Sequence, residues 1–189
     1  GMGGVNGGQI ASKIAVKVMK ETIVSMYKSD YNEREINTML KLAVIKANNA
    51  VYNKACEDVN LKGMGTTAIV AFMQRDVVTV IYLGDSRAYK IKDNEIKKLS
   101  KDHSIIQTLI ELGQITEEEA ENHPQKNIIT KALGIDKDIE PDIFKTHLQR
   151  GDVLFLCTDG LYNMVDSERI VEIKKDNTLE KFVNQLIDE

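Results

Sequence analysis

The chain has 189 residues, of which 42% are hydrophobic and 29% charged, and its formal net charge is −4. A chain of this length buries a core of its own, so we expect a single domain over residues 1–189. The mild charge and the even spread of Lys and Arg give no electrostatic reason to expect a nucleic-acid partner. No apolar run approaches the roughly 18 residues that span a bilayer, so no membrane segment is expected.

Only two cysteines occur, Cys56 and Cys157. They are too few for a disulfide framework, and a reducing cytoplasm is the simpler expectation. Cys157 falls in a predicted apolar strand and is interpreted as a core residue.

Two long helices are predicted in the first third of the chain. Apolar residues at helical spacing predict a helix over residues 9–26. After a polar link at residues 28–32, a second apolar stripe runs from Ile36 to Ala55. Each stripe must pack against a sheet or against the other helix.

The apolar pattern then changes to a period of two, which is typical of strands. Residues rich in β-branched side chains predict strands over residues 66–72, 77–83, 87–92 and 95–99. Short turns at residues 74–76 and 93–94 join neighbours, so we expect an antiparallel meander. Residues 143–148 and 153–157, joined by a Gln-Arg-Gly-Asp turn, predict a further hairpin.

Helical patterns occupy the segments between and after these strands. One runs over residues 104–112 and is closed by Gly113, and a short acidic helix follows Thr116, whose capping box uses Glu119. Two more are predicted over residues 167–173 and 179–187. Helices and antiparallel hairpins are segregated along the chain, which favours an α+β layered fold over a parallel sheet.

Two aspartates directly follow apolar strands. Asp85 stands in Gly-Asp-Ser-Arg at residues 84–87, and Asp159 stands in Thr-Asp-Gly at residues 158–160. A carboxylate at the tip of a buried strand is a common way to present a metal ligand on a rigid element, and carboxylates suit Mg²⁺ and Mn²⁺. The alternative for each is an aspartate that forms a turn by bonding its own backbone.

The glycine-rich opening could cradle a phosphate on backbone N–H groups. Residues 3–8 have the glycine spacing of a P-loop, but Gln9 and Ile10 follow in place of Lys and Ser or Thr. Residues 1–6 lack the last glycine of a dinucleotide fingerprint and follow no strand. The alternative interpretation is a flexible lead-in to the first helix.

Other catalytic schemes lack a necessary residue. Neither cysteine has the Arg six positions later that a cysteine phosphatase needs, and no Gly-x-Ser-x-Gly elbow occurs. His103, His123 and His147 have no paired spacing for zinc. We interpret His147, in a strand, as structural, and the other two, in loops, as polar contacts.

Several short motifs follow one another along the chain. They are Gly-Met-Gly-Gly at residues 1–4, Gly-Met-Gly-Thr-Thr at 63–67, Gly-Asp-Ser-Arg-Ala-Tyr at 84–89, Lys-Asp-His-Ser at 101–104, His-Pro at 123–124, Asn-Ile-Ile-Thr-Lys-Ala-Leu-Gly at 127–134 and Cys-Thr-Asp-Gly-Leu at 157–161. Together they resemble the type 2C family of metal-dependent Ser/Thr protein phosphatases, in its bacterial form. The resemblance spans essentially the whole chain.

The resemblance implies an antiparallel β-sandwich flanked by helices in four αββα layers, with a Mn²⁺ or Mg²⁺ centre at one end. In that family, a metal-activated water hydrolyses phosphoserine and phosphothreonine in proteins that a Ser/Thr kinase has modified. Carried onto this chain, Asp159 is a ligand of the second metal and Asp85 of a third, while the carbonyl of Gly1 serves the first. Residues 104–124 match a flap beside the active site.

The chain also departs from the family pattern. The family has a bridging Asp before Gly-Met-Gly-Gly, a phosphate-binding Arg upstream of it, and a closing Asp-Asn motif, none of which has a counterpart here. We therefore expect a domain truncated at both ends, lacking terminal strands, whose open sheet edges promote self-association.

Two carboxylates cannot coordinate two divalent ions, so we expect this chain to be inactive or nearly so. The alternatives are a pseudophosphatase acting as a regulatory or binding module, and a soluble α+β domain whose aspartates only form turns.

Overall fold

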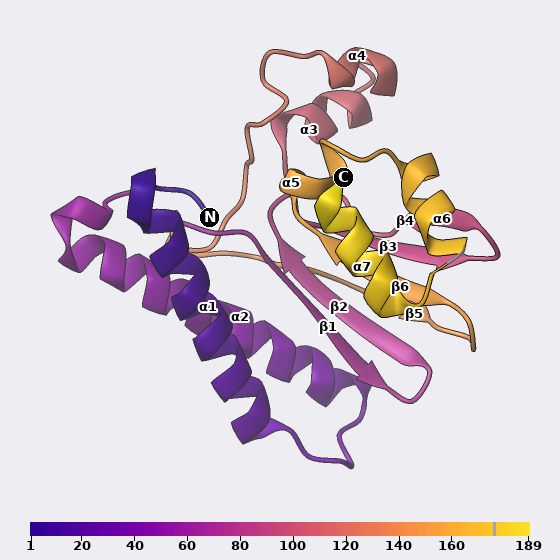
Figure 1. Cartoon of the computed structure of the whole chain (residues 1–189). Helices are drawn as coiled ribbons and strands as arrows, with labels where there is room; N and C mark the ends of the chain where they lie inside the picture. Colours follow the sequence, from indigo (N-terminus) through magenta and orange to yellow (C-terminus); the bar gives the residue numbers. More distant parts are fainter. Residues whose placement is uncertain (176) are drawn as a thin grey trace.

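Two three-stranded antiparallel sheets lie between two pairs of helices, α1 with α2 and α6 with α7 (Figure 1). The computed structural model describes residues 1–175 and 177–189, without the side chains of residues 4–6. The elements in chain order are α1 (Gly4–Met26), α2 (Glu33–Glu57), a 3₁₀ turn (Val59–Leu61), β1 (Ala68–Gln74), β2 (Val77–Leu83), β3 (Arg87–Lys92), β4 (Glu95–Lys98), α3 (Ile105–Glu111), α4 (Glu117–Glu121), β5 (Asp142–His147), β6 (Val153–Cys157), α5 (Asp159–Tyr162), α6 (Ser167–Lys175) and α7 (Leu179–Asp188).

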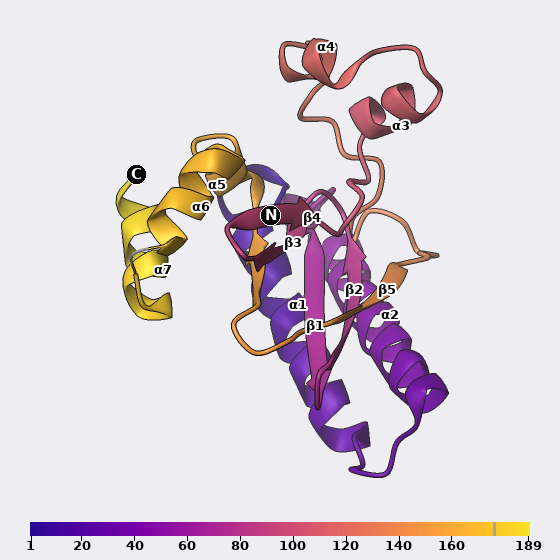
Figure 2. The same ribbon diagram turned by 90° about the vertical axis from the view of Figure 1, so that its right-hand side faces the viewer.

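The elements stack in four layers, as Figures 1 and 2 show from two sides. One sheet has the order β1-β2-β5 and the other the order β4-β3-β6. Alternate residues of β2 face opposite ways: Ile81 and Leu83 pack with α1 and α2, and Val78 and Val80 face the other sheet. On the far side, α6 and α7 cover the second sheet, where Phe182 is fully buried. The predicted αββα sandwich is confirmed.

The strand connections differ from the prediction. The hairpins β1-β2 and β3-β4 form, but β2 pairs with β5 and β3 pairs with β6, so the predicted four-stranded meander is wrong. The predicted hairpin of β5 with β6 is wrong for the same reason. Residues 84–86 and 148–152 each carry the chain from one sheet to the other. Short loops between consecutive strands favour hairpins, but here the packing of the two sheets places the consecutive strands in different sheets.

Gly84 begins the first of these crossovers. Its φ is 110°, and a Cβ at this position would lie 2.4 Å from Cγ2 of Thr67. The Gly84 N–H donates to Nδ1 of His103 at 2.9 Å, and its carbonyl accepts from the His103 N–H at 3.0 Å. The crossover that carries Asp85 is therefore anchored at its first residue, where only glycine fits.

The glycine-rich opening is part of a close-packed helix start. Helix α1 begins at Gly4, five residues before the predicted start, and Gly7 and Gly8 are buried within it. A Cβ on Gly8 would lie 2.4 Å from the carbonyl carbon of Gly1. From Gly4 onward, the residues interpreted as a lead-in are therefore part of α1. Among the described residues, no helix combines the length and the apolar character needed to cross a bilayer.

Candidate active site

The two aspartates that follow β2 and β6 lie at the same end of the sandwich. Strands β3 and β6 are antiparallel, and Arg87 stands opposite Cys157 in their register. Asp85 lies two residues before Arg87, and Asp159 lies two residues after Cys157. Antiparallel pairing thus brings the start of one strand beside the end of the other, with both carboxylates beyond the last pair.

Neither carboxylate is neutralised by a neighbour. Asp85 is half-buried and Asp159 is exposed, and within the described residues neither forms an ion pair. Burial raises the pKa of the Asp85 carboxyl above its ordinary value, and the negative charge of Asp159 raises it further. Two unpaired negative charges that repel each other create a place where a cation is stabilised.

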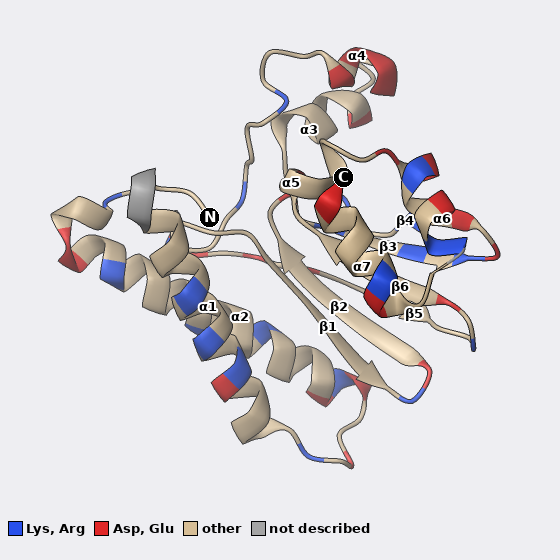
Figure 3. Cartoon of the chain, in the orientation of Figure 1, with Lys and Arg blue, Asp and Glu red and all other residues tan. Residues whose placement is uncertain are grey.

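The two carboxylates border a cleft of about 710 Å³. Its wall includes α3 and α4, which stand away from the sandwich in both views (Figures 1 and 2). Acidic residues gather on α4 (Figure 3), and two of them, Glu117 and Glu121, line the cleft. The other lining residues are Asp85, Arg87, Tyr89, Ile96, Lys98, Asp102, Ser104, Ile106, Gln107, Ile110, Ala120, Lys126, Asn127, Asp159, Tyr162, Asn163 and Ser167.

A charge network supports the floor of this cleft. Arg87 donates from Nε and Nη2 to Oδ2 of Asp102 at 3.0 and 2.7 Å, and Lys98 Nζ lies 2.8 Å from Oδ1 of Asp102. Burial disfavours the charge of Arg87, but the bonds to Asp102 outweigh burial and raise its pKa. For Lys98 burial prevails and lowers the pKa. The bonds to Asp102 therefore hold the Arg87 side chain, two residues after Asp85, in one orientation.

The donor set fits one hard divalent ion better than two. Carboxylate oxygens are the ligands that Mg²⁺ and Mn²⁺ prefer. Across residues 1–175 and 177–189, no three His, Cys, Asp or Glu side chains gather at one point. Mg²⁺ is commonly held through one or two carboxylates while water fills its other coordination positions. Asp85 and Asp159 can provide those two carboxylates.

Comparisons with known proteins agree with the motifs. A family model described as protein phosphatase 2C matches residues 1–188. The chain belongs to the protein phosphatase 2C family. It is 37% identical over 179 residues to the serine/threonine phosphatase stp of Listeria welshimeri, covering 93% of this chain and 69% of that protein.

Solved structures show the same fold. The serine/threonine phosphatase Stp1 of Staphylococcus aureus superposes with a TM-score of 0.91 at 35% identity, over 99% of this chain and 73% of that one. The catalytic domain of PstP, described in complex with two manganese ions, gives a TM-score of 0.84 at 29% identity, over 99% of this chain and 76% of that one. By family, the chain is a protein serine/threonine phosphatase.

Within this phosphatase fold, the sequence-predicted residues have different surroundings. Asp85 and Asp159 share the cleft, whereas Gly1 is not among the described residues that line it. Met2, next to Gly1, is tied to Gly65 by two backbone hydrogen bonds of 2.7 and 3.1 Å. Half-buried Cys157 ends β6, and burial raises the pKa of its thiol to about 11, which keeps the thiol protonated at neutral pH.

The histidines lie outside the phosphatase cleft. His103 is buried against Tyr82, with ring centroids 5.2 Å apart, and holds Gly84 as described above. His147 is exposed at the end of β5 and pairs with Asp76 at 3.2 Å. His123 accepts a hydrogen bond from the N–H of Gln125. His103 thus acts on the site indirectly, through the crossover that carries Asp85.

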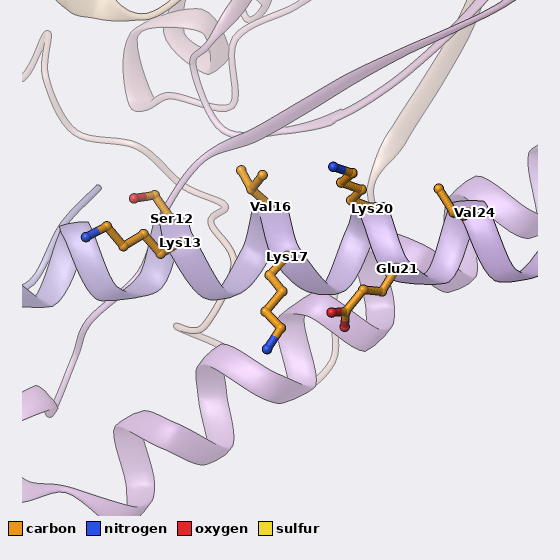
Figure 4. A pocket seen from close by; sticks show the side chains of 7 residues that line it. All are labelled: Ser12, Lys13, Val16, Lys17, Lys20, Glu21 and Val24. Carbon is orange, nitrogen blue, oxygen red and sulfur yellow. The ribbon is translucent and has the colours of Figure 1, made fainter.

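A second hollow of about 640 Å³ runs along α1, away from these residues. Figure 4 shows Val16 and Lys20 on one side of the helix and Lys17 and Glu21 on the other, so they do not converge on a point. With one carboxylate and no paired acid and base, this surface offers the phosphatase no second reaction centre.

Proposed function

We propose that this chain hydrolyses phosphoserine and phosphothreonine in proteins with Mn²⁺ or Mg²⁺ as cofactor, held in part by Asp159 and Asp85. The observation that carries the proposal is the pair of unneutralised, mutually repelling carboxylates at one end of the sandwich, bordering an open cleft. The manganese ions described for PstP support the choice of metal.

A bound divalent ion supplies an activated water and neutralises charge on the phosphoryl group. Asp159, at the start of α5, and Asp85, in the crossover before β3, would hold that ion. Arg87 is engaged by Asp102 and is not free to bind the substrate phosphate. We assign residues 104–124, which include α3 and α4, to a flap that forms the wall along which a phosphorylated segment lies. Such substrates are the products of protein Ser/Thr kinases.

We further propose that the 189-residue polypeptide, assayed alone, turns over slowly. Two divalent ions need more protein ligands than Asp85, Asp159 and the carbonyl of Gly1 supply. The alternative is a pseudophosphatase that binds phosphoproteins without turnover. It is favoured by the absence, among the described residues, of a third carboxylate beside Asp85 and Asp159.

The test is hydrolysis of a phosphothreonine peptide over a range of Mn²⁺ concentrations. Turnover of the wild type should require Mn²⁺ and fall at least about tenfold in Asp159→Asn and Asp85→Asn, as when metal ligation is disturbed. Asp138→Asn is the matched control, because Asp138 is exposed and outside the cleft. Turnover unaffected by chelation would refute metal dependence, and fast turnover would refute the expected slowness. Peptide binding without any turnover would establish the pseudophosphatase.

A further inference from the structure

Tyr162 connects the two segments that carry the aspartates. Helix α5 begins with Asp159 and ends with Tyr162, so both residues belong to one helical turn. The Tyr162 hydroxyl donates a hydrogen bond to the backbone carbonyl of Asp85 at 3.2 Å. Within the described residues, no other hydrogen bond joins α5 to residues 84–86.

The Tyr162 ring rests on a fixed base. The guanidinium carbon of Arg87 lies 3.5 Å from the ring centroid, which is a cation–π contact. The edges of the same guanidinium bond to Asp102 and to the hydroxyl of Tyr89 at 3.3 Å. Because its Nε and Nη2 both bond to Asp102, the guanidinium keeps one orientation against the ring, and this fixes where the Tyr162 hydroxyl points.

Asp85 and Asp159 carry like charges at the same end of the sandwich. Their like charges favour separation of the crossover from α5, and a half-buried carboxyl gains hydration if its loop opens. A hydrogen bond from Tyr162 to the backbone of Asp85 opposes that separation and leaves both carboxylates free. A tyrosine phenol, with an ordinary pKa of about 10, carries its proton throughout the neutral range and can therefore donate this bond.

We propose that Tyr162 is a positioning residue that fixes Asp85 relative to Asp159. This inference rests on the proposed function, since the spacing of the two carboxylates matters for holding a divalent ion. Tyr162 itself touches neither carboxylate oxygens nor substrate in this role. It acts through the backbone of Asp85, and therefore Phe at this position keeps the ring on Arg87 and removes only the link.

The test compares Tyr162→Phe with Tyr89→Phe in the full chain without metal. Amide hydrogen exchange at Asp85 and Ser86 should rise about fivefold in Tyr162→Phe, the change in a local opening equilibrium when one hydrogen bond is lost. Tyr89→Phe also removes a hydroxyl bonded to Arg87 but has no bond to Asp85, so exchange there should match the wild type. Unchanged exchange in Tyr162→Phe, or an equal rise in both variants, would overturn the proposal.

Mn²⁺ binding, measured by paramagnetic resonance of the free ion, separates this inference from the proposed function. Weaker binding in Tyr162→Phe than in Tyr89→Phe supports the positioning role. If the wild type binds no Mn²⁺ while exchange rises in Tyr162→Phe, the metal-dependent function fails and the positioning role stands. If the wild type binds Mn²⁺ and Tyr162→Phe changes neither exchange nor affinity, the positioning role fails alone.

Discussion

Replacing Asp102 by Asn should destabilise the fold, because it leaves two cations without the carboxylate that pairs with them. The Asp102 side chain is 9% exposed and faces Arg87 and Lys98, which are 25% and 31% exposed. Removing one partner of a buried ion pair costs about 3–5 kcal/mol, because the other charge is left unpaired. Partial hydration of both cations reduces this to about 2–4 kcal/mol. For a domain of this size, Tm should fall by roughly 5–15 °C.

Urea unfolding measures the free energy directly, and a double-mutant cycle with Lys98→Met tests its cause. Lys98→Met should destabilise the wild type but be neutral or stabilising once Asp102 is Asn, because it then removes an unpaired cation. Glu111→Gln, which breaks the exposed pair of Glu111 with Lys101, is the control and should leave the urea midpoint unchanged. An Asp102→Asn variant within about 0.5 kcal/mol of wild type would refute the reasoning.

Three further predictions concern the crossover and the thiols. Gly84→Ala should lower the free energy of unfolding in urea by about 2–4 kcal/mol, because φ is 110° there and the added Cβ would clash with Thr67. Gly113→Ala should lower it by only about 1 kcal/mol, because φ is 65° and the space around Gly113 is open. Equal losses in the two variants would contradict this. Burial lowers the pKa of His103 below its ordinary value near 6.5, so the unfolded chain binds the proton more readily and stability is lost as pH falls through the folded pKa. The urea midpoint should drop between about pH 7.5 and about pH 5.5, and an equally steep drop in His103→Gln would exclude His103 as its source. At about pH 8, Cys157, with its pKa near 11, should react with a thiol reagent far more slowly than exposed Cys56, and similar rates would show that Cys157 is not shielded.

Periodicity alone predicted most of the elements of this fold, but not how the strands pair. The β-branched apolar run of β2 and the apolar stripe of α2 identify a strand and a helix without knowledge of their partners. Pairing depends on contacts between distant segments, such as Ile81 with Ile143, and no local pattern reports them. The short helix α5 was missed, because a single turn of four residues has no detectable period.

The candidate site likewise combines residues that a local pattern predicts with residues whose roles depend on distant contacts. Asp85 and Asp159 were predicted from their place after apolar strands, since strand ends can be read from the sequence. The roles of Asp102 and Tyr162 depend on side chains that meet Arg87 and the Asp85 carbonyl only in the folded chain. The motif at residues 101–104 contains Asp102, but the sequence gives this residue no role.

The most direct test of the central claim is whether Asp159 holds a divalent ion at this site. Mn²⁺ binding to the metal-free chain should be saturable, and its affinity should fall at least about tenfold in Asp159→Asn, as when metal ligation is disturbed, and remain unchanged in Asp138→Asn. Wild-type affinity in Asp159→Asn would contradict the assignment of the metal site.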